Sequence, residues 1–586
     1  MKYLPLLFCA FSLSLTAAEP EFPLTADSKP QAEVAKGTLI KDSYTAPESS
    51  VFPGTVREYQ IYLPVGFDKT KPAHFMVFQD GLIYQAPVVF DNLIAKKDIP
   101  SLVGIFIKPG VVPAANDNAL PRFNRSYEYD SITPTYSKFL IEEFLPALEK
   151  KHAISLSQDP NHAAISGNSS GGICAFMVAW HRPDRFRRVF TGVGTYVGIH
   201  GADQLPVLVR KIEPKPLRIY LQSGTGDNNL YCGDWWMANQ MMERSLTWAG
   251  YDVNHAWGEG GHNGKHATQI FPDVLRWLWR DWQTDIEVKA NPKGESKWKG
   301  YEVVEGKSMD WTRLAVSKDE EYETIAANAA GLIVTAGHSG KVHSISSTGH
   351  IGTFCEVQRP IAAMAFAPNG DLVMHTHDDK LGQDLALLHC AEGKVPEKIE
   401  IASNYSRSLL IDHKGVVFLG NGVGLNHPSH GGGPIQVNGL TVTTKSWPIL
   451  MCLSPDQTLL YGFERGHLTA STISPEGELI HTQEFHKIVS LGEAEAGRGW
   501  SMGEMCVDTE GRLYVATTLG IQVCDQAGRV NFIIPTPKPA HDVCFGGKDL
   551  SELFIACGDT IYKRPTKVHG VVSGQQAPIK PAPPKL

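Results

Sequence analysis

The chain has 586 residues, of which 42% are hydrophobic and 20% are charged, and its formal net charge is −8. A chain of this length exceeds what one hydrophobic core supports, so two or more domains are expected. The modest acidic charge provides no basic surface for a phosphate backbone, which argues against nucleic acid as a partner.

The N-terminus predicts an export signal at residues 1–18. Lys2 supplies the positive start, Leu4 to Leu15 is apolar, and Thr16-Ala17-Ala18 offers small residues for cleavage before the following glutamate. A secreted or periplasmic protein is therefore expected. No later run is long and apolar enough to span a bilayer. Residues 19–50 are rich in Pro, Ala, Ser and charge, and they predict a loosely ordered leader segment.

Strand and helix patterns alternate over residues 51–284. Short apolar or alternating runs predict strands at 56–63, 74–78, 102–107, 162–165, 217–221 and 255–257. Helical spacing predicts helices at 135–152, 173–180, 235–249 and 271–282, with a bend at Pro146 in the first of them. Such alternation favours an α/β domain, with a mostly parallel sheet covered by helices on both faces.

One motif in this region carries chemistry. Gly167-Asn168-Ser169-Ser170-Gly171 fits Gly-x-Ser-x-Gly, the nucleophile elbow of an α/β-hydrolase. A short apolar run precedes it and a long apolar run follows it, as the strand, sharp turn and helix of the motif require. The turn strains the backbone at the serine, so its neighbours must lack bulky side chains, which glycine satisfies. Ser169 is the predicted nucleophile.

A serine hydroxyl needs a base to remove its proton, and in this fold the chain order is serine, acid, histidine. His262 lies in a glycine-rich loop before the last predicted helix and is the predicted general base. Asp227, in the loop after the strand at 217–221, is the predicted acid, with Asp234 as the second choice. His266 is four residues beyond His262, but the glutamate of a His-Glu-x-x-His zinc motif is missing, so no metal is predicted there.

Two backbone N–H groups should bind the oxyanion of the intermediate. The first belongs to Ser170, which follows the nucleophile. The second should come from the loop after the strand at 74–78, where Gly81 or Leu82 is the candidate, although a plain turn would use the same residues.

Substrate contacts are less sharply indicated. Trp235 and Trp236, close to the predicted acid, would suit a sugar or aryl subsite, but tryptophans more often lie in a core. Arg125 stands with Arg122 and Glu128 in a charged cluster that either faces the cleft or is a solvated loop.

The sequence pattern changes after a polar linker at 285–297. Between 298 and 566 helical patterns vanish, and a unit of strand, tight turn and strand recurs at 325–334, 364–373, 409–418, 451–461, 505–514 and 543–554. Six copies at roughly forty-residue spacing predict a six-bladed β-propeller. Residues 567–586 contain many Pro and Lys residues and predict a disordered tail.

The cysteine pattern gives no disulfide framework. Of ten cysteines, Cys9 lies in the predicted signal, and the other nine have no regular spacing and no Cys-x-x-Cys. Mostly free, buried thiols are expected, with Cys232 and one pair in the propeller left open.

Two resemblances follow from these motifs. Residues 37–282 resemble the esterase family that includes enterochelin esterases and feruloyl or acetyl-xylan esterases. The landmarks are Phe52-Pro53-Gly54-Thr55-Val56-Arg57, Val77-Phe78-Gln79-Asp80-Gly81, Asn124-Arg125-Ser126-Tyr127-Glu128-Tyr129-Asp130, the serine elbow and Glu259-Gly260-Gly261-His262. The resemblance implies a Ser169-His262-Asp227 triad and hydrolysis of carboxylic esters.

Residues 298–564 are similar to the gluconolactonase (senescence-marker protein) family of six-bladed propellers, on Leu513 to Thr517 and Leu519 to Val523. Members with lactonase activity hold a divalent metal on Glu and Asn or Asp side chains. This chain has Ile449, Gly503 and Arg407 where that pattern places ligands, which leaves Glu323 and Glu504. No metal and no cofactor are therefore expected.

The sequence thus predicts an exported serine esterase, acting through an acyl-enzyme on an ester that is carbohydrate- or siderophore-linked, with the propeller as a binding module that contacts carbohydrate or a surface. The alternative is a metal-dependent lactonase in the propeller, and a third hypothesis is a binder without catalysis. The acyl group, the alcohol and the oligomeric state are not determined by the sequence.

Overall fold

The computed structural model describes residues 21–288, 296–316, 320–346, 348–357, 359–376, 387–399, 408–420, 435–437, 440–442, 448–464, 466–491 and 502–584. The predicted signal at 1–18 lies outside these residues. The chain divides into two compact units. The first contains the chain to Asp203, Leu217–Arg244 and Val253–Glu287, and the second contains Gln204–Pro216, Ser245–Asp252 and everything from Val288 onward. The predicted limits at 51–284 and 298–566 stay predictions.

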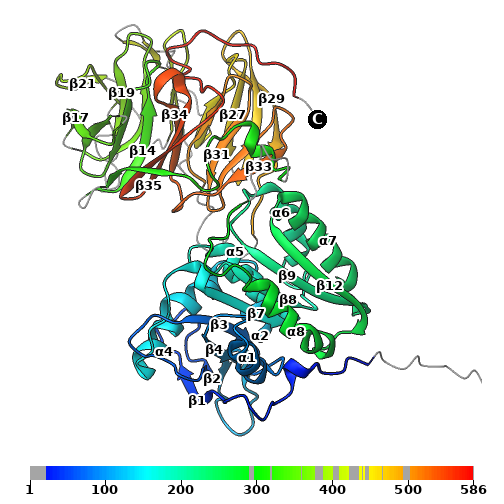
Figure 1. The fold of residues 1–586 in the computed structure, drawn as a ribbon. Helices are drawn as coiled ribbons and strands as arrows, with labels where there is room; N and C mark the ends of the chain where they lie inside the picture. Colours follow the sequence, from blue (N-terminus) through cyan, green and yellow to red (C-terminus); the bar gives the residue numbers. More distant parts are fainter. Residues whose placement is uncertain are drawn as a thin grey trace, which may run out of the picture. The chain divides into compact units, whose positions relative to one another are not determined.

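A mixed sheet of ten strands forms the centre of the first unit (Figure 1). Its order is β12-β9-β8-β7-β3-β4-β2-β5-β6, with β1 paired to β2. Strands β4, β3, β7, β8 and β9 run parallel to one another, whereas β2 is antiparallel to β1 and β4. The bounds are β1 Thr38–Thr45, β2 Val56–Leu63, β3 His74–Gln79, β4 Leu102–Ile107, β5 Val111–Val112, β6 Arg122–Phe123, β7 Ala163–Asn168, β8 Arg188–Gly192, β9 Arg218–Gly226 and β12 Asp252–Gly261.

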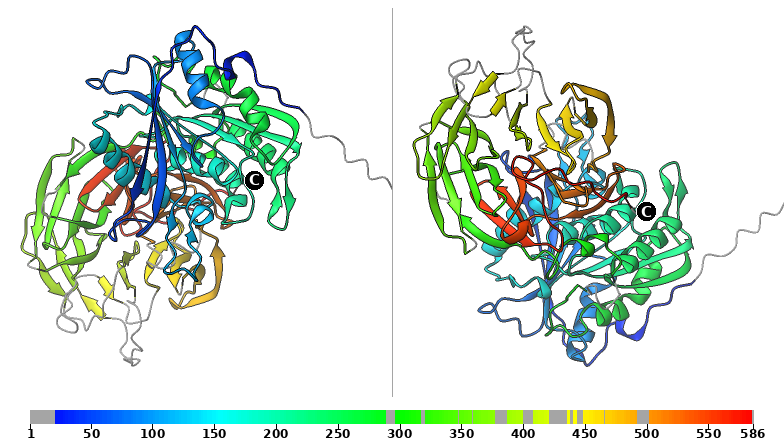
Figure 2. Two further views of the ribbon diagram at one scale, coloured as in Figure 1. Left: turned by 90° about the horizontal axis from the view of Figure 1, so that it is seen from below. Right: turned by 90° about the horizontal axis from the view of Figure 1, so that it is seen from above.

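Helices cover both faces of this sheet, as the alternating pattern predicted. Residues of α1 and α8 share one core cluster, and α2 and α3 pack against α5 on the other side; Figure 2 shows the strands from two further directions with helices on either side. The bounds are α1 Ala86–Ala95, α2 Arg125–Tyr129, α3 Thr135–Lys138, α4 Leu145–His152, α5 Ser170–His181, α6 Leu205–Lys211, α7 Trp235–Ala249 and α8 Lys265–Leu278. None of the helices in the described part of the chain has the length and apolar character of a membrane span.

The helix predicted at 135–152 is interrupted. It runs as α3, a π-helical segment Phe139–Phe144 and then α4, with Pro146 in the first turn of α4. A proline there lacks the N–H that would bond to the preceding turn, and the wider π segment accommodates its ring. The predicted bend at Pro146 is therefore a change of helix type.

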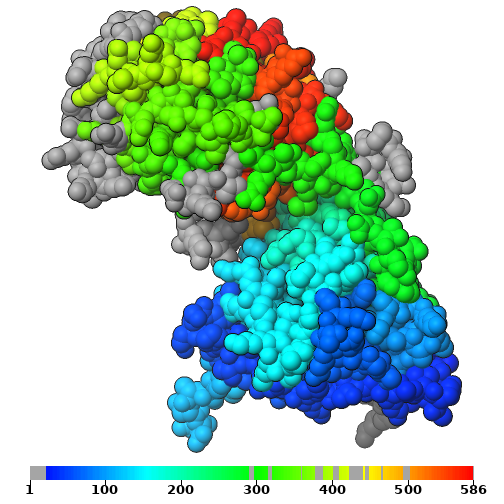
Figure 3. All heavy atoms as spheres, turned by 60° about the vertical axis from the view of Figure 1, so that its left-hand side comes forward, coloured from blue at the N-terminus to red at the C-terminus, as the bar shows by residue number. Residues whose placement is uncertain are grey.

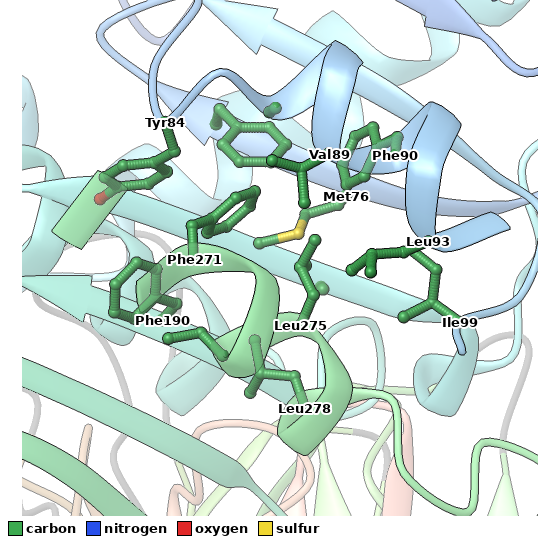
Figure 4. Close-up of a cluster of buried hydrophobic side chains, with 14 of the residues drawn as sticks. Met76, Tyr84, Val89, Phe90, Leu93, Ile99, Phe190, Phe271, Leu275 and Leu278 are labelled. Carbon is green, nitrogen blue, oxygen red and sulfur yellow. The ribbon is translucent and has the colours of Figure 1, made fainter. Parts of the chain in front are cut away.

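Aromatic rings dominate the core beneath α1 and α8 (Figure 4). Phe271 of α8 is fully buried, and its ring centroid lies 4.9 Å from that of Tyr84 and 5.9 Å from that of Phe78. The Phe190 ring of β8 lies 6.1 Å away. Offset aromatic contacts of this kind add to the burial of apolar surface. The last helix is thus fixed to the sheet just beyond the loop that carries His262.

The leader prediction for residues 19–50 was wrong over much of its length. Thr38–Thr45 form β1, which pairs along all eight residues with β2. Upstream, Asp27 accepts hydrogen bonds from Lys96 and Arg276, and Asn92 donates to the backbone carbonyls of Asp27 and Lys29. Composition alone misses this segment because its order comes from pairing with the sheet and with α1.

Six four-stranded sheets make up the propeller of the second unit. They consist of β14–β17 (Tyr322–Ala327, Ile333–Gly337, Lys341–Ile345, Ile351–Glu356), β18–β21 (Ile361–Phe366, Leu372–Thr376, Leu387–Cys390, Glu397–Ile399), β22–β25 (Leu409–Ile411, Val416–Leu419, Ile435–Val437, Leu440–Val442), β26–β29 (Leu450–Leu453, Leu459–Glu464, His467–Ile473, Leu479–His486), β30–β33 (Met505–Val507, Leu513–Thr517, Gly520–Cys524, Val530–Ile534) and β34–β36 (Asp542–Gly546, Glu552–Cys557, Thr560–Pro565) with β13 (Thr312–Val316). Because β13 pairs with β36, the first strand of the propeller completes its last blade. The six-bladed prediction is confirmed.

The prediction of a disordered tail at 567–586 was also wrong within the described residues. Val571 N–H donates to the Val507 carbonyl, and Ile579 N–H donates to the Pro455 carbonyl. A Cβ atom on Gly574 would lie 2.2 Å from the Phe366 carbonyl oxygen, so the tail packs tightly. In Figure 3 the red C-terminal residues lie on the propeller surface beside its green and orange strands. Low-complexity composition hid these backbone contacts.

The nine cysteines of the described chain are all unpaired. Cys232 is half-buried, and the six thiols of Cys174, Cys355, Cys390, Cys452, Cys524 and Cys557 are buried. This agrees with the expectation of free, mostly buried thiols.

Replacing Phe271 with alanine should lower the free energy of unfolding of the first unit by about 3–5 kcal/mol, because the removed ring leaves a cavity among aromatic neighbours. Urea unfolding followed by tryptophan fluorescence measures this change. Phe123→Ala, at a side chain that is 69% exposed, is the control and should shift stability by less than about 0.5 kcal/mol. Equal effects of the two substitutions would contradict the described core.

Candidate active site

Three side chains that are distant in the chain meet at one edge of the sheet. Ser169 follows β7, Asp227 follows β9 and His262 follows β12. His262 Nε2 lies 2.8 Å from Ser169 Oγ, and His262 Nδ1 lies 2.6 Å from Asp227 Oδ1. Because an ionised carboxylate only accepts, Nδ1 donates to Asp227 and Nε2 is left as the acceptor for the serine proton. The arrangement can activate a hydroxyl for attack on a carbonyl carbon.

Asp227 is held by more than the histidine. Its side chain is fully buried, while that of His262 is 21% exposed. Ser223 Oγ donates to Asp227 Oδ2 at 2.7 Å, and the Asn228 backbone N–H donates to Oδ1 at 2.8 Å. These hydrogen bonds fix the orientation of the Asp227 carboxylate toward the imidazole. Asp234, the second choice for the acid, instead accepts from the Met237 backbone N–H at the start of α7.

The backbone at the nucleophile is strained. Ser169 has φ +57° and ψ −123°, a conformation that residues with a side chain rarely adopt. A Cβ atom on Gly167 would lie 2.3 Å from the Gly171 carbonyl oxygen, and one on Gly171 would lie 2.8 Å from Asp80 Oδ2. Glycine is therefore required at 167 by contact with the Gly171 backbone and at 171 by contact with the Asp80 side chain. The turn projects the Ser169 side chain from the sheet edge at the start of α5.

The structure leaves fewer candidates for the two oxyanion donors. Ser170 is the first residue of α5, so its N–H has no partner within the helix and adds to the positive end of the helix dipole. The Gly81 N–H donates to the Ile107 carbonyl at 3.0 Å, so Gly81 cannot serve as the second donor. That correction leaves Leu82 as the candidate from the β3–α1 loop, which bends sharply because Asp80 and Gly81 both have positive φ.

Arg125 joins this loop to the elbow. Its Nε and Nη2 donate to the two carboxylate oxygens of Asp80 at 2.7 and 2.8 Å, and Nη1 donates to Ser170 Oγ at 3.0 Å. The paired guanidinium is therefore a link between the two predicted oxyanion loops, and its role in substrate binding stays a prediction. Two parallel charged hydrogen bonds fix this geometry more firmly than a single contact would.

The short helix α2 that carries Arg125 has its own anchor. Glu128 of α2 and Arg57 of β2 form a fully buried ion pair at 2.6 Å, and Glu128 also accepts the Gly110 N–H. Glu128 is therefore no part of a solvated loop, whereas Arg122 is exposed. Removing one partner of a buried pair leaves an unpaired charge, so each residue depends on the other.

The two tryptophans differ in their surroundings. Trp235 is only 3% exposed, donates its indole N–H to Thr195 Oγ1, and packs edge-on against the His262 ring with centroids 5.5 Å apart. It is a buried wall of the site, so the predicted substrate contact of Trp235 was wrong. Trp236 is half-buried against Trp257 and stays a candidate for a subsite.

Two residues of the site had no signal in the sequence. Thr195, with its Oγ1 3.2 Å from Ser169 Oγ, and Ser223, which bonds Asp227, lie in no recognised motif. Thr195 lies just after β8 and Ser223 lies within β9, and these positions bring them to the sheet edge where the triad residues meet. His266 is largely buried, with Nδ1 3.2 Å from Gln222 Nε2 and its ring stacked on Phe22, which fits a structural role.

The propeller has a central cavity of about 140 Å³, lined by the inner strands of its blades and by Val571 to Gly574 of the tail. Its charged groups are Glu504 and Asp542, and the nearby thiols belong to Cys452, Cys506 and Cys544. Within the described residues, no group of three or more His, Cys, Asp and Glu side chains is arranged to hold a metal ion. The described residues of the cavity thus supply two carboxyl groups, and Arg407 lies outside the described residues.

The two cavity carboxyls lie in an apolar environment. Burial raises the pKa of Asp542 to about 7 and raises the pKa of Glu504 well above its ordinary value. Asp542 accepts two backbone N–H groups, from Ile325 and Val543, but these bonds do not offset the loss of hydration. Both groups thus bind a proton more tightly in the folded protein than in the unfolded chain.

Comparison with known families matches each part of the chain separately. Residues 50–271 match the model of the family described as "Putative esterase". Residues 437–558 match the SMP-30/gluconolactonase/LRE-like region. The sequence resemblances are confirmed by these two matches.

Individual proteins similar to each part of the chain are also found. An iron(III) enterobactin esterase of Dickeya dadantii (strain 3937) is 29% identical over 152 residues, which cover 23% of this chain and 33% of that protein. The enterobactin esterase of Shigella flexneri gives a TM-score of 0.34 at 20% identity, covering 44% of this chain and 63% of that one. A gluconolactonase of Xanthomonas campestris gives a TM-score of 0.35 at 18% identity, covering 44% and 89%. The chain thus spans less than two thirds of the enterobactin esterases that it matches.

Arg125→Met should lower the turnover of an ester by about 10- to 100-fold, because the loop of Asp80 and Leu82 loses its link to the elbow and the donors shift by a fraction of an ångström. Steady-state kinetics with an aryl acetate measures the effect. Arg182→Met is the matched control, since Arg182 makes a similar two-point contact with Asp184 on the surface. Full activity of the Arg125 variant would contradict the link.

The propeller should lose stability as the pH rises from about 4 to about 7. In this pH range Asp542 and Glu504 ionise in the unfolded chain but stay protonated in the folded protein. Each of these carboxyls therefore lowers the free energy of unfolding by up to about 1.4 kcal/mol per pH unit. Urea unfolding at pH 5 and pH 7.5 should show a smaller difference for Asp542→Asn than for the unchanged protein. Asp559→Asn is the control, because its exposed partner Lys538 lowers the pKa of Asp559. An unchanged pH dependence in Asp542→Asn would refute the assignment.

Proposed function

We propose that the first unit hydrolyses carboxylic esters through a serine acyl-enzyme. The observation that carries the proposal is the hydrogen-bonded series Ser169–His262–Asp227, with contacts of 2.8 and 2.6 Å. The match of residues 50–271 to an esterase family and the likeness to an enterobactin esterase support ester hydrolysis. The strained elbow, which fixes the serine at the start of a helix, supports the serine as nucleophile.

The chemistry follows from these positions. Ser169 Oγ bonds to the ester carbonyl carbon while its proton moves to His262 Nε2, and Asp227 stabilises the imidazolium. The carbonyl oxygen takes the negative charge and accepts from the N–H groups of Ser170 and Leu82. When the tetrahedral intermediate breaks down, the bond between the carbonyl carbon and the alcohol oxygen is cleaved, and the alcohol leaves with the proton from His262. Water then attacks the acyl carbon while His262 accepts its proton. His262 returns this proton to Ser169 Oγ as the acid is released.

The natural ester is proposed to be carbohydrate- or siderophore-linked. The likeness to enterobactin esterases supports the siderophore class, and half-buried Trp236 beside the site supports an aromatic or sugar group. The propeller is proposed as a binding module for carbohydrate or a cell surface, since its cavity carboxyls do not form a metal site. Export to the periplasm or beyond is proposed on the signal-like sequence at residues 1–18.

Ser169→Ala should reduce ester turnover by at least about 10³-fold, because the only activated oxygen of the triad is removed. A panel of acetyl, feruloyl, glucuronoyl and siderophore-like esters, assayed with both proteins, tests the reaction and ranks the substrates. Ser137→Ala is the control, since that hydroxyl donates to the Pro134 carbonyl and not to the triad. Unchanged turnover by Ser169→Ala rejects the mechanism. Lactone hydrolysis that a chelator abolishes, without any serine-dependent ester hydrolysis, would support the propeller lactonase instead.

A further inference from the structure

A second hydroxyl lies beside the nucleophile. Thr195 is fully buried in the segment that follows β8, and its Oγ1 is 3.2 Å from Ser169 Oγ. The backbone holds this contact in place, because the Thr195 N–H donates to the Ser169 carbonyl and the Ser169 N–H donates to the Gly192 carbonyl. The threonine is therefore fixed to the elbow itself, and its hydroxyl remains close to the reacting oxygen.

The direction of the hydrogen bond between the two hydroxyls follows from a third residue. Trp235 Nε1 lies 3.2 Å from Thr195 Oγ1, and the indole N–H can only donate. Thr195 Oγ1 accepts this bond, so its own proton is free to be donated to Ser169 Oγ. Ser169 then directs its proton to His262 Nε2 at 2.8 Å. The sequence of donors runs from Trp235 through Thr195 and Ser169 to His262 and ends at Asp227.

A buried amide group holds together the two segments that carry Trp235 and Thr195. Asn239 is fully buried, and its Nδ2 donates at 2.9 Å both to the Gly194 carbonyl and to the Trp235 carbonyl. The loop that carries Thr195 and the first turn of α7, which carries Trp235, are thereby held together. Two hydrogen bonds from one buried amide nitrogen therefore fix the position of the threonine hydroxyl relative to the indole N–H.

We propose that Thr195 and Trp235 are positioning residues that orient the hydroxyl of the nucleophile. This inference rests on the proposed serine mechanism and adds two residues that no motif marks. A donor to Ser169 Oγ aims the serine proton at His262, leaves a lone pair for the carbonyl carbon, and stabilises the negative charge that grows on the oxygen as its proton departs. A serine without that donor rotates among several orientations, only some of which face the histidine.

The test compares variants that keep the shape of residue 195 and change only its hydroxyl. Thr195→Val removes the hydroxyl at nearly equal volume, and Thr195→Ser retains it. Thr191→Val is the matched control, because Thr191 is also fully buried, lies within β8 itself, and accepts from Tyr196 OH at 3.2 Å, away from the triad. Trp235→Phe removes the indole N–H and leaves the threonine hydroxyl without its fixed direction.

Turnover and KM for an aryl acetate, the rate of Ser169 modification by an aryl phosphonate, and the thermal midpoint are measured on the full-length protein. For Thr195→Val we expect kcat to fall on the order of 10- to 100-fold with KM within about twofold, and the phosphonate rate to fall in parallel. Thr195→Ser should recover most of the loss. Trp235→Phe should give a loss smaller than that of Thr195→Val.

Three results would overturn the inference. They are a kcat of Thr195→Val within about twofold of the unchanged protein, an equal loss in Thr191→Val, or no recovery in Thr195→Ser at an unchanged thermal midpoint. If Thr195→Val fails to fold, the comparison of Thr195→Ser with Trp235→Phe decides: activity that is insensitive to loss of the indole N–H refutes the directed series. Activity that survives Ser169→Ala refutes the esterase proposal itself, whereas loss in Ser169→Ala with none in Thr195→Val refutes only this inference.

Discussion

The site depends on one strained turn. Ser169 adopts φ +57° at the junction of β7 and α5, a conformation that costs about 1–3 kcal/mol and persists only where its surroundings enforce it. Glycine at 167 permits the close approach of the Gly171 backbone, and glycine at 171 leaves room for the Asp80 side chain. Parallel pairing of β7 with β3 and β8 fixes the strand that enters the turn. Without this turn the hydroxyl would not face the imidazole.

The groups around the turn are connected through buried polar contacts. On one side, Arg57 holds Glu128, and α2 then presents Arg125 to Asp80 and Ser170. On the other side, Trp235 and Thr195 reach the nucleophile from α7 and from the segment after β8. These contacts fix loops that carry no regular structure. This arrangement explains how the site can be precise although it is assembled from several separate segments.

The propeller is built by a different rule. Its blades repeat one strand-turn-strand unit, and the ring closes because β13 joins the last blade. The inner strands leave a cavity whose carboxyls, Glu504 and Asp542, are protonated more readily than in water.

Sequence periodicity and motifs were sufficient to predict the two folds, the six-bladed repeat and the grouping of Ser169, His262 and Asp227. These features depend on local sequence patterns that the two folds require. Sequence reasoning misjudged the residues whose role comes from a distant partner. Gly81 gives its N–H to Ile107, Trp235 is buried against His262, β1 is ordered by β2, and the tail is ordered by backbone contacts with the propeller. Thr195 went unseen because a lone threonine carries no motif. Such contacts join segments far apart in the chain, so the sequence determined which chemistry is present, and only the tertiary structure decided which side chains support it.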